Sequence, residues 1–181
     1  MINTTYLARL VILILLLLES IRNTSADEQL IHTVCKETPS PDACESILLA
    51  DPRGVLSHTR KDLAIVAVDA TISAATSANR NAGYMAGQYS GSPQGEPLAQ
   101  CEQLYLMLVI DLQSVKAMLK VSSFEEAYQA ASDVWKIPDA CDNEFATRRL
   151  SSLLKRRNKE LNQKISLCVN LAYQMIDEGH Y

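Results

Sequence analysis

The amino-acid sequence predicts an all-α protein, an up-and-down four-helix bundle preceded by a short N-terminal helical hairpin. Three observations carry this prediction. Apolar residues recur at alternating intervals of three and four over long stretches, which is the pattern of bundle helices. Clusters of turn-forming residues separate these stretches, so the connections are short and neighbouring helices run antiparallel. Five cysteines follow a short apolar N-terminal run, which predicts disulfide staples.

The first 26 residues are expected to be a secretory signal peptide. Arg9 precedes an unbroken apolar run over residues 10–18, and small residues end at Ala26, where we expect cleavage. The alternative is an uncleaved anchor, but the run is shorter than a membrane-spanning helix needs. Residues 27–181 would then form one soluble, secreted domain with no membrane attachment. Within it we expect the helical hairpin over residues 27–57 and the bundle over residues 58–178.

Two stretches carry the clearest helical pattern, with seven residues each on a stripe that should face the core. The middle helix is predicted from Leu98, Cys101, Tyr105, Leu108, Leu112, Val115 and Leu119. The last helix is predicted from Leu154, Asn158, Leu161, Ile165, Cys168, Ala172 and Met175. A third helix is predicted over the alanine-rich residues 62–89, with its core stripe at Leu63, Val66, Ala70, Ala74, Ser77, Asn81 and Tyr84.

The remaining bundle helix is predicted over residues 124–135. Ser122 and Ser123 each precede a glutamate by three residues, which predicts two overlapping capping boxes at its start. Pro138 cannot donate a backbone hydrogen bond, so a kink or restart is expected near Asp139. Ahead of the bundle, two short helices are predicted over residues 28–35 and 41–50, with Ser40 as the N-cap of the second.

The five cysteines are Cys35, Cys44, Cys101, Cys141 and Cys168. An odd number allows at most two internal bridges and leaves one thiol. Spacing alone does not choose among the possible pairings. A bridge between Cys35 and Cys44 would hold the two short helices together, because helices of that length are marginal alone.

Charge and motifs exclude several classes of function. The net charge is −4, and about −5 without the signal residues, so the chain is not expected to bind nucleic acid. No metal-binding or nucleophile motif surrounds the histidines or serines, and we expect neither an enzyme nor a cofactor nor a metal site. A basic run stands out, either as a patch for an anionic polysaccharide or acidic partner, or as a solvated helix end. It comprises Arg148, Arg149, Lys155, Arg156, Arg157 and Lys159.

The segment from Val34 to Cys44 resembles the N-terminal signature of the plant invertase and pectin methylesterase inhibitor family. The later Asp51-Pro52-Arg53 and Cys141-Asp142-Asn143-Glu144-Phe145 segments are similar to further elements of that family. The resemblance implies the disulfides Cys35–Cys44 and Cys101–Cys141, with Cys168 as a free thiol. It also implies a monomer secreted to the plant cell wall that inhibits its target one-to-one and catalyses nothing.

The turn before the fourth bundle helix bears on the target. Invertase inhibitors of the family often carry Pro-Lys-Phe there, whereas this chain has Ser122-Ser123-Phe124. Pectin methylesterase inhibitors resemble this chain in placing an aromatic residue at the position of Phe124 relative to Cys141, and in having a fifth cysteine. We therefore expect inhibition of a pectin methylesterase, with a cell-wall or vacuolar acid invertase as the alternative target. A non-inhibitory secreted bundle and a carrier of an apolar ligand stay open as other classes.

The partner is expected to meet the positions that the core stripes leave free. On the middle helix these include Asp111, Ser114 and Met118, and at the following turn Phe124 and Glu125. Phe124 is the expected anchor, because aromatic residues are frequent hot spots of protein interfaces. The alternative is that Phe124 only caps the core of the bundle.

Overall fold

The computed structural model describes residues 9, 13–14 and 28–178. The expected cleavage site at Ala26 and most of the expected signal peptide lie outside these residues. Over the described part of the chain the elements are α-helices and one 3-10 turn, with no strand, which confirms the all-α class. Within this part, no helix combines the length and the apolar character needed to cross a membrane.

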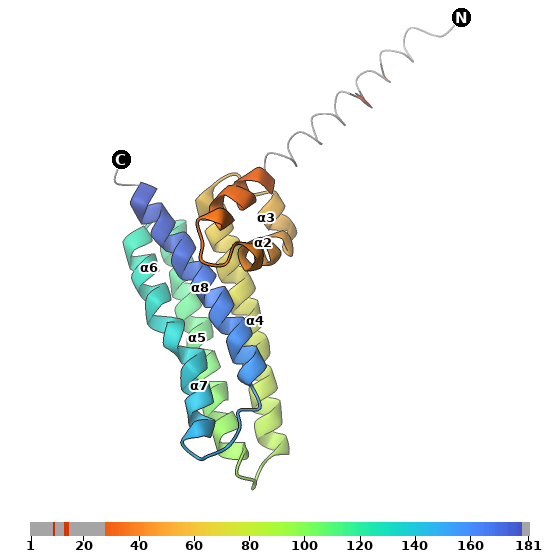
Figure 1. Cartoon of the computed structure of the whole chain (residues 1–181), viewed down its shortest axis with the longest axis vertical. Coiled ribbons are helices and arrows are strands. Elements are labelled where there is room, and N and C mark those ends of the chain that lie inside the picture. The colour runs from red at the N-terminus through yellow and green to blue at the C-terminus, as the bar shows by residue number, and fades with distance from the viewer. Residues whose placement is uncertain (1–8, 10–12, 15–27, 179–181) are drawn as a thin grey trace, which may run out of the picture.

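Long helices form the predicted up-and-down bundle (Figure 1). They are α4 (Arg60–Gln88), α5 (Gly95–Lys120), α6 (Phe124–Asp133) continued by α7 (Ile137–Ala146), and α8 (Lys155–Glu178). Both α5 and α8 pack against α4 and against the α6–α7 arm. The helices α5 and α8 therefore occupy diagonal corners of the bundle, and their outward sides face away from each other.

The core stripes of the middle and last helices are confirmed, since every predicted residue of both is buried. The predicted stripe of α4 is wrong beyond Val66. Tyr84 is 69% exposed, and the buried side of the helix includes Ala67, Thr71, Ala75, Ala78 and Ala82. Alanine lies on nearly every side of this helix, so the contrast between its apolar and polar sides is too small to set the register.

The connection between α5 and α6 differs from the predicted capping boxes. Ser122 adopts a left-handed conformation with φ of 60°. Its N–H donates to the Leu119 carbonyl, and the Ser123 N–H donates to the Met118 carbonyl, both over 3.0–3.1 Å. This pair of bonds is a Schellman motif, which ends α5. Ser123 is the N-cap residue of α6, but its side chain accepts no capping bond.

Pro138 interrupts the fourth bundle helix as predicted. In an unbroken α-helix the amide of residue 138 would donate to the Val134 carbonyl, and proline has no such hydrogen. The Ile137 N–H donates to the Val134 carbonyl instead. The chain tightens into a 3-10 turn, η1 (Val134–Lys136), before α7 begins.

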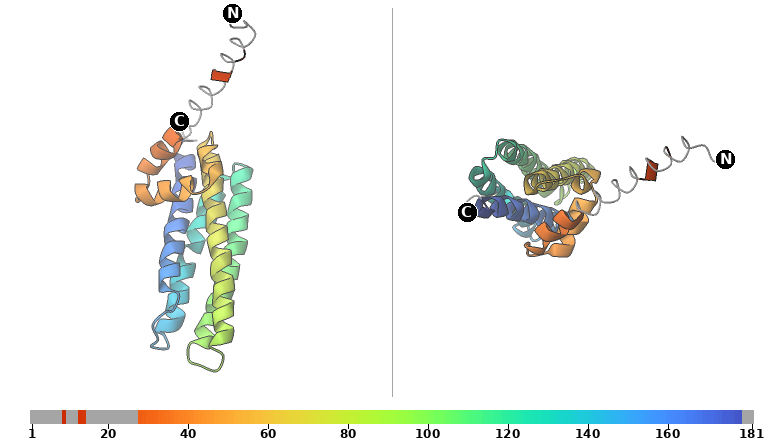
Figure 2. Two further views of the ribbon diagram at one scale, coloured as in Figure 1. Left: turned by 90° about the vertical axis from the view of Figure 1, so that its right-hand side faces the viewer. Right: turned by 90° about the horizontal axis from the view of Figure 1, so that it is seen from above.

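The N-terminal hairpin lies outside the bundle, beside α8 (Figure 2). Residues 28–36 are helical and are followed by α2 (Pro41–Leu49) and a single turn, α3 (Pro52–Val55). The hairpin elements α2 and α3 pack on α4, and α2 also packs on α8. Gly54 is required at its position, because a Cβ there would lie 2.0 Å from the Leu48 carbonyl oxygen.

Two disulfides staple these parts. Cys35–Cys44 closes the hairpin, and Cys101–Cys141 joins α5 to α7. These are the pairs that the family resemblance implies. Cys168 is free and buried on α8, where its sulfur lies 3.2 Å from the Thr71 hydroxyl of α4.

Candidate functional site

The outward side of α5 exposes only uncharged residues over most of its length. The exposed fractions of Leu106, Met107 and Ile110 are 45%, 53% and 54%. We define the α5 face as the exposed residues of this stretch: Gln100, Gln103, Leu106, Met107, Ile110, Gln113, Ser114 and Ala117. Large apolar side chains grouped on an exposed helix indicate a surface that meets another macromolecule.

Core packing, a disulfide and an ion pair fix α5 against its neighbouring helices. The core stripe of α5 is fully buried between α4 and the α6–α7 arm, and the Cys101–Cys141 disulfide anchors the helix to α7. The Lys116 ammonium donates to the Asp69 carboxylate of α4 over 2.6 Å. A second cation reaches the same carboxylate, since Arg53 of α3 donates to it over 2.8 Å. Asp69 therefore ties α3, α4 and α5 together.

The charge of Asp69 is maintained against partial burial. Burial alone would raise the pKa of the Asp69 carboxyl, but the hydrogen bonds from Lys116 and Arg53 outweigh it and lower that pKa below its usual value. Lys116 and Arg53 share the Asp69 carboxylate, and Arg53 also pairs with Asp51, the N-cap residue of α3. The Lys116 ammonium at the edge of the α5 face is therefore paired with a carboxylate.

The structure places the predicted contact residues on and around this face. Ser114 is exposed and belongs to the α5 face, and Asp111 and Met118 are half-buried along its edge. Glu125 is exposed in the first turn of α6. Phe124 is half-buried and packs against the core, so it is not a freely projecting anchor.

Sequence reasoning missed the largest side chains of the face. Leu106, Met107 and Ile110 are apolar residues that do not belong to the core stripe of α5, and no role was assigned to them. The signal was present, since a bundle helix normally carries polar residues at its outward positions. Three exposed apolar residues within the five positions from Leu106 to Ile110 indicate a surface that meets a partner.

The described residues contain no group of three or more histidine, cysteine, aspartate or glutamate side chains that could hold a metal ion. His32 lies on the hairpin, where its Nδ1 pairs with the Glu45 carboxylate over 2.7 Å.

Comparison with known proteins identifies the family. The family model described as plant invertase/pectin methylesterase inhibitor matches residues 29–171. The chain belongs to this family. Its members are inhibitors and not enzymes, so this chain carries an inhibitor domain. The match includes the hairpin, both disulfides and the whole α5 face.

A solved structure shares this architecture. The crystal structure of a pectin methylesterase inhibitor from Arabidopsis thaliana is similar with a TM-score of 0.60, over 81% of this chain and 96% of that chain. The two sequences are 16% identical, so this likeness concerns the fold. Among curated proteins, no sequence matches.

Proposed function

We propose that this protein is a secreted inhibitor of a plant cell-wall pectin methylesterase, and that it covers the substrate cleft of the enzyme with the α5 face. The observation that carries the mode of action is the run of exposed, uncharged residues along α5, centred on Met107 and Ile110. Family membership supplies the inhibitory class. Disulfides and the N-terminal apolar run support an oxidising, extracellular location.

The geometry suits inhibition by occlusion. A helix clamped by a disulfide and a packed core has little conformational freedom to lose when it docks, which favours binding. Apolar side chains at the centre of such a face supply the contact energy, and the polar residues Gln103, Gln113 and Ser114 form a rim. The protein needs no chemistry of its own to block a cleft in a one-to-one complex.

The choice of target rests on the α5–α6 turn. This turn lacks the Pro-Lys pair of many invertase inhibitors and retains an aromatic residue, Phe124, as in pectin methylesterase inhibitors. Acid invertase is the alternative target. One experiment distinguishes the two targets, because the same purified protein can be titrated into both enzymes.

The test uses the mature chain with both disulfides formed. Residual activity of a pectin methylesterase and of an acid invertase is measured at increasing inhibitor concentration. We expect stoichiometric loss of pectin methylesterase activity and no loss of invertase activity. Ile110→Arg is expected to weaken inhibition by on the order of a hundredfold, since burying an unpaired charge in an interface costs several kcal/mol.

Leu49→Arg serves as the matched control. Leu49 is 46% exposed, much like Leu106, but it lies on the hairpin and not on α5. This variant should inhibit as the parent protein does. Equal inhibition by the Ile110→Arg variant would refute the α5 face as the contact surface. Inhibition of invertase alone would refute the proposed target, and inhibition of neither enzyme would favour a non-inhibitory bundle.

A further inference from the structure

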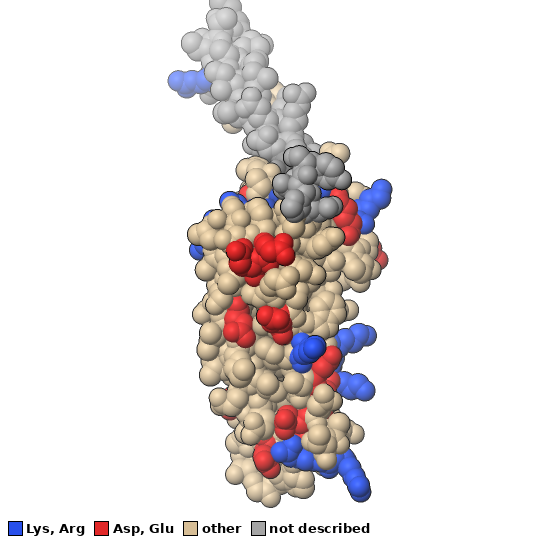
Figure 3. All heavy atoms as spheres, turned by 90° about the vertical axis from the view of Figure 1, so that its left-hand side faces the viewer, with Lys and Arg blue, Asp and Glu red and all other residues tan. Residues whose placement is uncertain are grey.

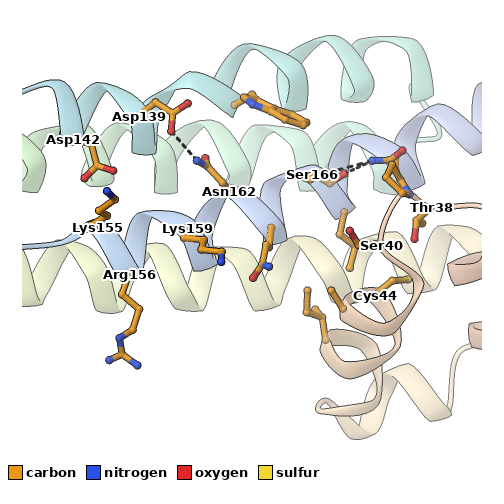
Figure 4. Close-up of a pocket in the computed structure, with 17 residues that line it drawn as sticks. Thr38, Ser40, Cys44, Asp139, Asp142, Lys155, Arg156, Lys159, Asn162 and Ser166 are labelled. Atoms are coloured by element: carbon orange, nitrogen blue, oxygen red, sulfur yellow. Dashed lines mark hydrogen bonds between the residues drawn. The ribbon is translucent and has the colours of Figure 1, made fainter. Parts of the chain in front are cut away.

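A groove of about 810 Å³ lies along the outward side of α8, between the N-terminal hairpin and the start of α7 (Figure 4). We call it the α8 groove; its wall includes Ser40, Ile47, Trp135, Asp139, Lys159 and Asn162. Its volume is within the range of sites that bind organic ligands. Because α8 is diagonal to α5, the groove faces away from the α5 face and stands independently of the proposed inhibition.

One end of the groove is lined by basic side chains. Lys155, Arg156 and Lys159 line it, and all three belong to the basic run of the sequence. Among the described residues, neither lysine forms an ion pair within 4.0 Å, and Arg156 has only a long contact of 3.7 Å with Glu160. Lysine and arginine side chains gather along the corresponding edge of the molecule, on the right of Figure 3. This end of the groove is suited to a carboxylate-bearing ligand.

The groove also presents an aromatic surface. Trp135 lies in η1, the tight turn that Pro138 imposes, and its side chain is 43% exposed. A tryptophan in a regular bundle helix would normally bury more of its large ring. Here the indole lines the groove beside α8. The flat face of an indole packs well against the C–H groups on one side of a sugar ring.

Hydrogen-bonding groups complete the wall. Asp139 accepts a bond from the Asn162 amide over 2.8 Å, and Asp142 accepts one from the Asn158 amide over 2.7 Å. Figure 4 shows both aspartates projecting from α7 toward α8, with the bond from Asn162 to Asp139 as a dashed line. Each carboxylate has further lone pairs that can accept hydroxyl donors. Gln163 adds an amide with both donor and acceptor atoms.

We propose that the α8 groove binds a short oligosaccharide of uronic acids. Its carboxylates would pair with the lysines, one ring would stack on Trp135, and its hydroxyls would donate to Asp139 and Asp142. An acidic peptide fits less well, because it has no sugar ring to stack on Trp135. Its donors are single backbone N–H groups, whereas each uronic acid ring carries neighbouring hydroxyls. From residue 155 to residue 170 α8 rises about 22 Å, which is long enough for several linked rings.

The test measures binding of a defined oligogalacturonate to the mature protein at low salt. Trp135 is the only tryptophan of the chain, so its fluorescence reports directly on the groove. We expect a saturable fluorescence change that weakens as salt is raised, because the contacts include ion pairs. A neutral oligosaccharide of the same length and a poly-glutamate of the same charge are the comparison ligands. Both are expected to bind at least tenfold more weakly.

Two variants assign the site, with calorimetry as the common readout. Lys159→Glu and Trp135→Ala should each weaken oligogalacturonate binding by on the order of tenfold. Lys120→Glu makes the same charge change at the end of α5, away from the groove, and should bind as the parent does. Circular dichroism and thermal unfolding establish that each variant is folded. The Ile110→Arg variant should also bind normally, which separates this proposal from the proposed inhibition.

Several results would overturn the proposal. Poly-glutamate binding as tightly as the sugar acid, with Trp135→Ala unaffected, would assign the groove to an acidic peptide instead. Equal loss of binding in the Lys159→Glu and Lys120→Glu variants would show general electrostatic attraction and not a site. Absence of binding at about 1 mM oligogalacturonate, a free energy weaker than about −4 kcal/mol, would refute it outright.

Discussion

The Tyr105 hydroxyl of α5 donates a hydrogen bond to the side-chain carbonyl of Asn158 on α8, across the diagonal of the bundle. Both side chains are buried, with exposed fractions of 0% and 1%. The same hydroxyl lies 3.2 Å from the sulfur of Cys141, beside the disulfide that joins α5 to α7. The Asn158 amide in turn donates to Asp142 at the wall of the α8 groove. This short network fixes the lengthwise register of α5, α7 and α8.

Tyr105→Phe is expected to destabilise the protein. The substitution keeps the ring but removes the donor, and the Asn158 oxygen is then left unsatisfied in the core. Such a loss costs about 1–3 kcal/mol. Urea unfolding should show a lower midpoint. Tyr173→Phe is the matched control, because the Tyr173 side chain is 54% exposed and its hydroxyl can be hydrated. Equal midpoints for the two variants would mean that the network contributes nothing to stability.

Cys168 is expected to resist thiol reagents in the folded protein. Its sulfur is buried between α8 and α4, and burial raises the pKa of the Cys168 thiol to about 11. At pH 8 burial blocks access to the sulfur and little thiolate is present, and both effects slow the reaction. A thiol-reactive dye should therefore label one cysteine only after denaturation without reductant. Rapid labelling of the native protein, or a dimer that reductant dissociates, would contradict this expectation.

Stability is expected to fall in acid, below about pH 4. Hydrogen bonding from Arg53 lowers the pKa of Asp51, and hydrogen bonding from Arg60 lowers that of Glu37; the pKa of Asp69 is lowered by its two cations despite partial burial. A carboxyl whose pKa is lower when folded stabilises the protein above its unfolded pKa, near 4. That contribution is lost as pH falls through the folded pKa.

Asp69→Asn tests the acid effect. At pH 7 we expect the free energy of unfolding of the variant to be lower than that of the parent by up to about 1 kcal/mol, since these ion pairs are partly exposed. On acidification the variant should lose less stability than the parent protein does. Urea midpoints at pH 7 and pH 3 give the comparison. A variant whose stability declines with acid as steeply as that of the parent would show that Asp69 is not one of the responsible groups.

Much of this fold could be predicted from the sequence, because the core stripes of α5 and α8 alternate large apolar residues with polar ones. Such contrast sets both the helix and the side that it buries. The stripe of α4 could not be predicted, since alanine gives almost no contrast between its sides. Ser122 was misassigned because one serine pair can cap the start of a helix or close the end of the preceding one. Only the three-dimensional path of the chain decides between these uses.

The candidate site was predictable only in part. The core stripe predicts which residues of α5 lie on its outward side, and Ser114 does lie on that side. The exposure of Met107 and Ile110 depends on no neighbouring helix covering them, which a sequence pattern does not state. The α8 groove brings together residues from the hairpin, η1, α7 and α8 that lie far apart in the chain. No local sequence pattern predicts that these residues lie close together.

Two substitutions at Phe124 distinguish a role in packing the core from a role in binding the target. It packs against the core from the first turn of α6 and is half-buried, so Phe124→Ala should lower stability by on the order of 1–3 kcal/mol. Phe124→Leu keeps most of the buried volume and should restore much of that stability. If the exposed part of the ring contacts the target, both variants should inhibit on the order of tenfold more weakly at a temperature where each is folded. Inhibition that tracks stability alone, recovering in the leucine variant, would show that Phe124 serves the core and not the contact surface.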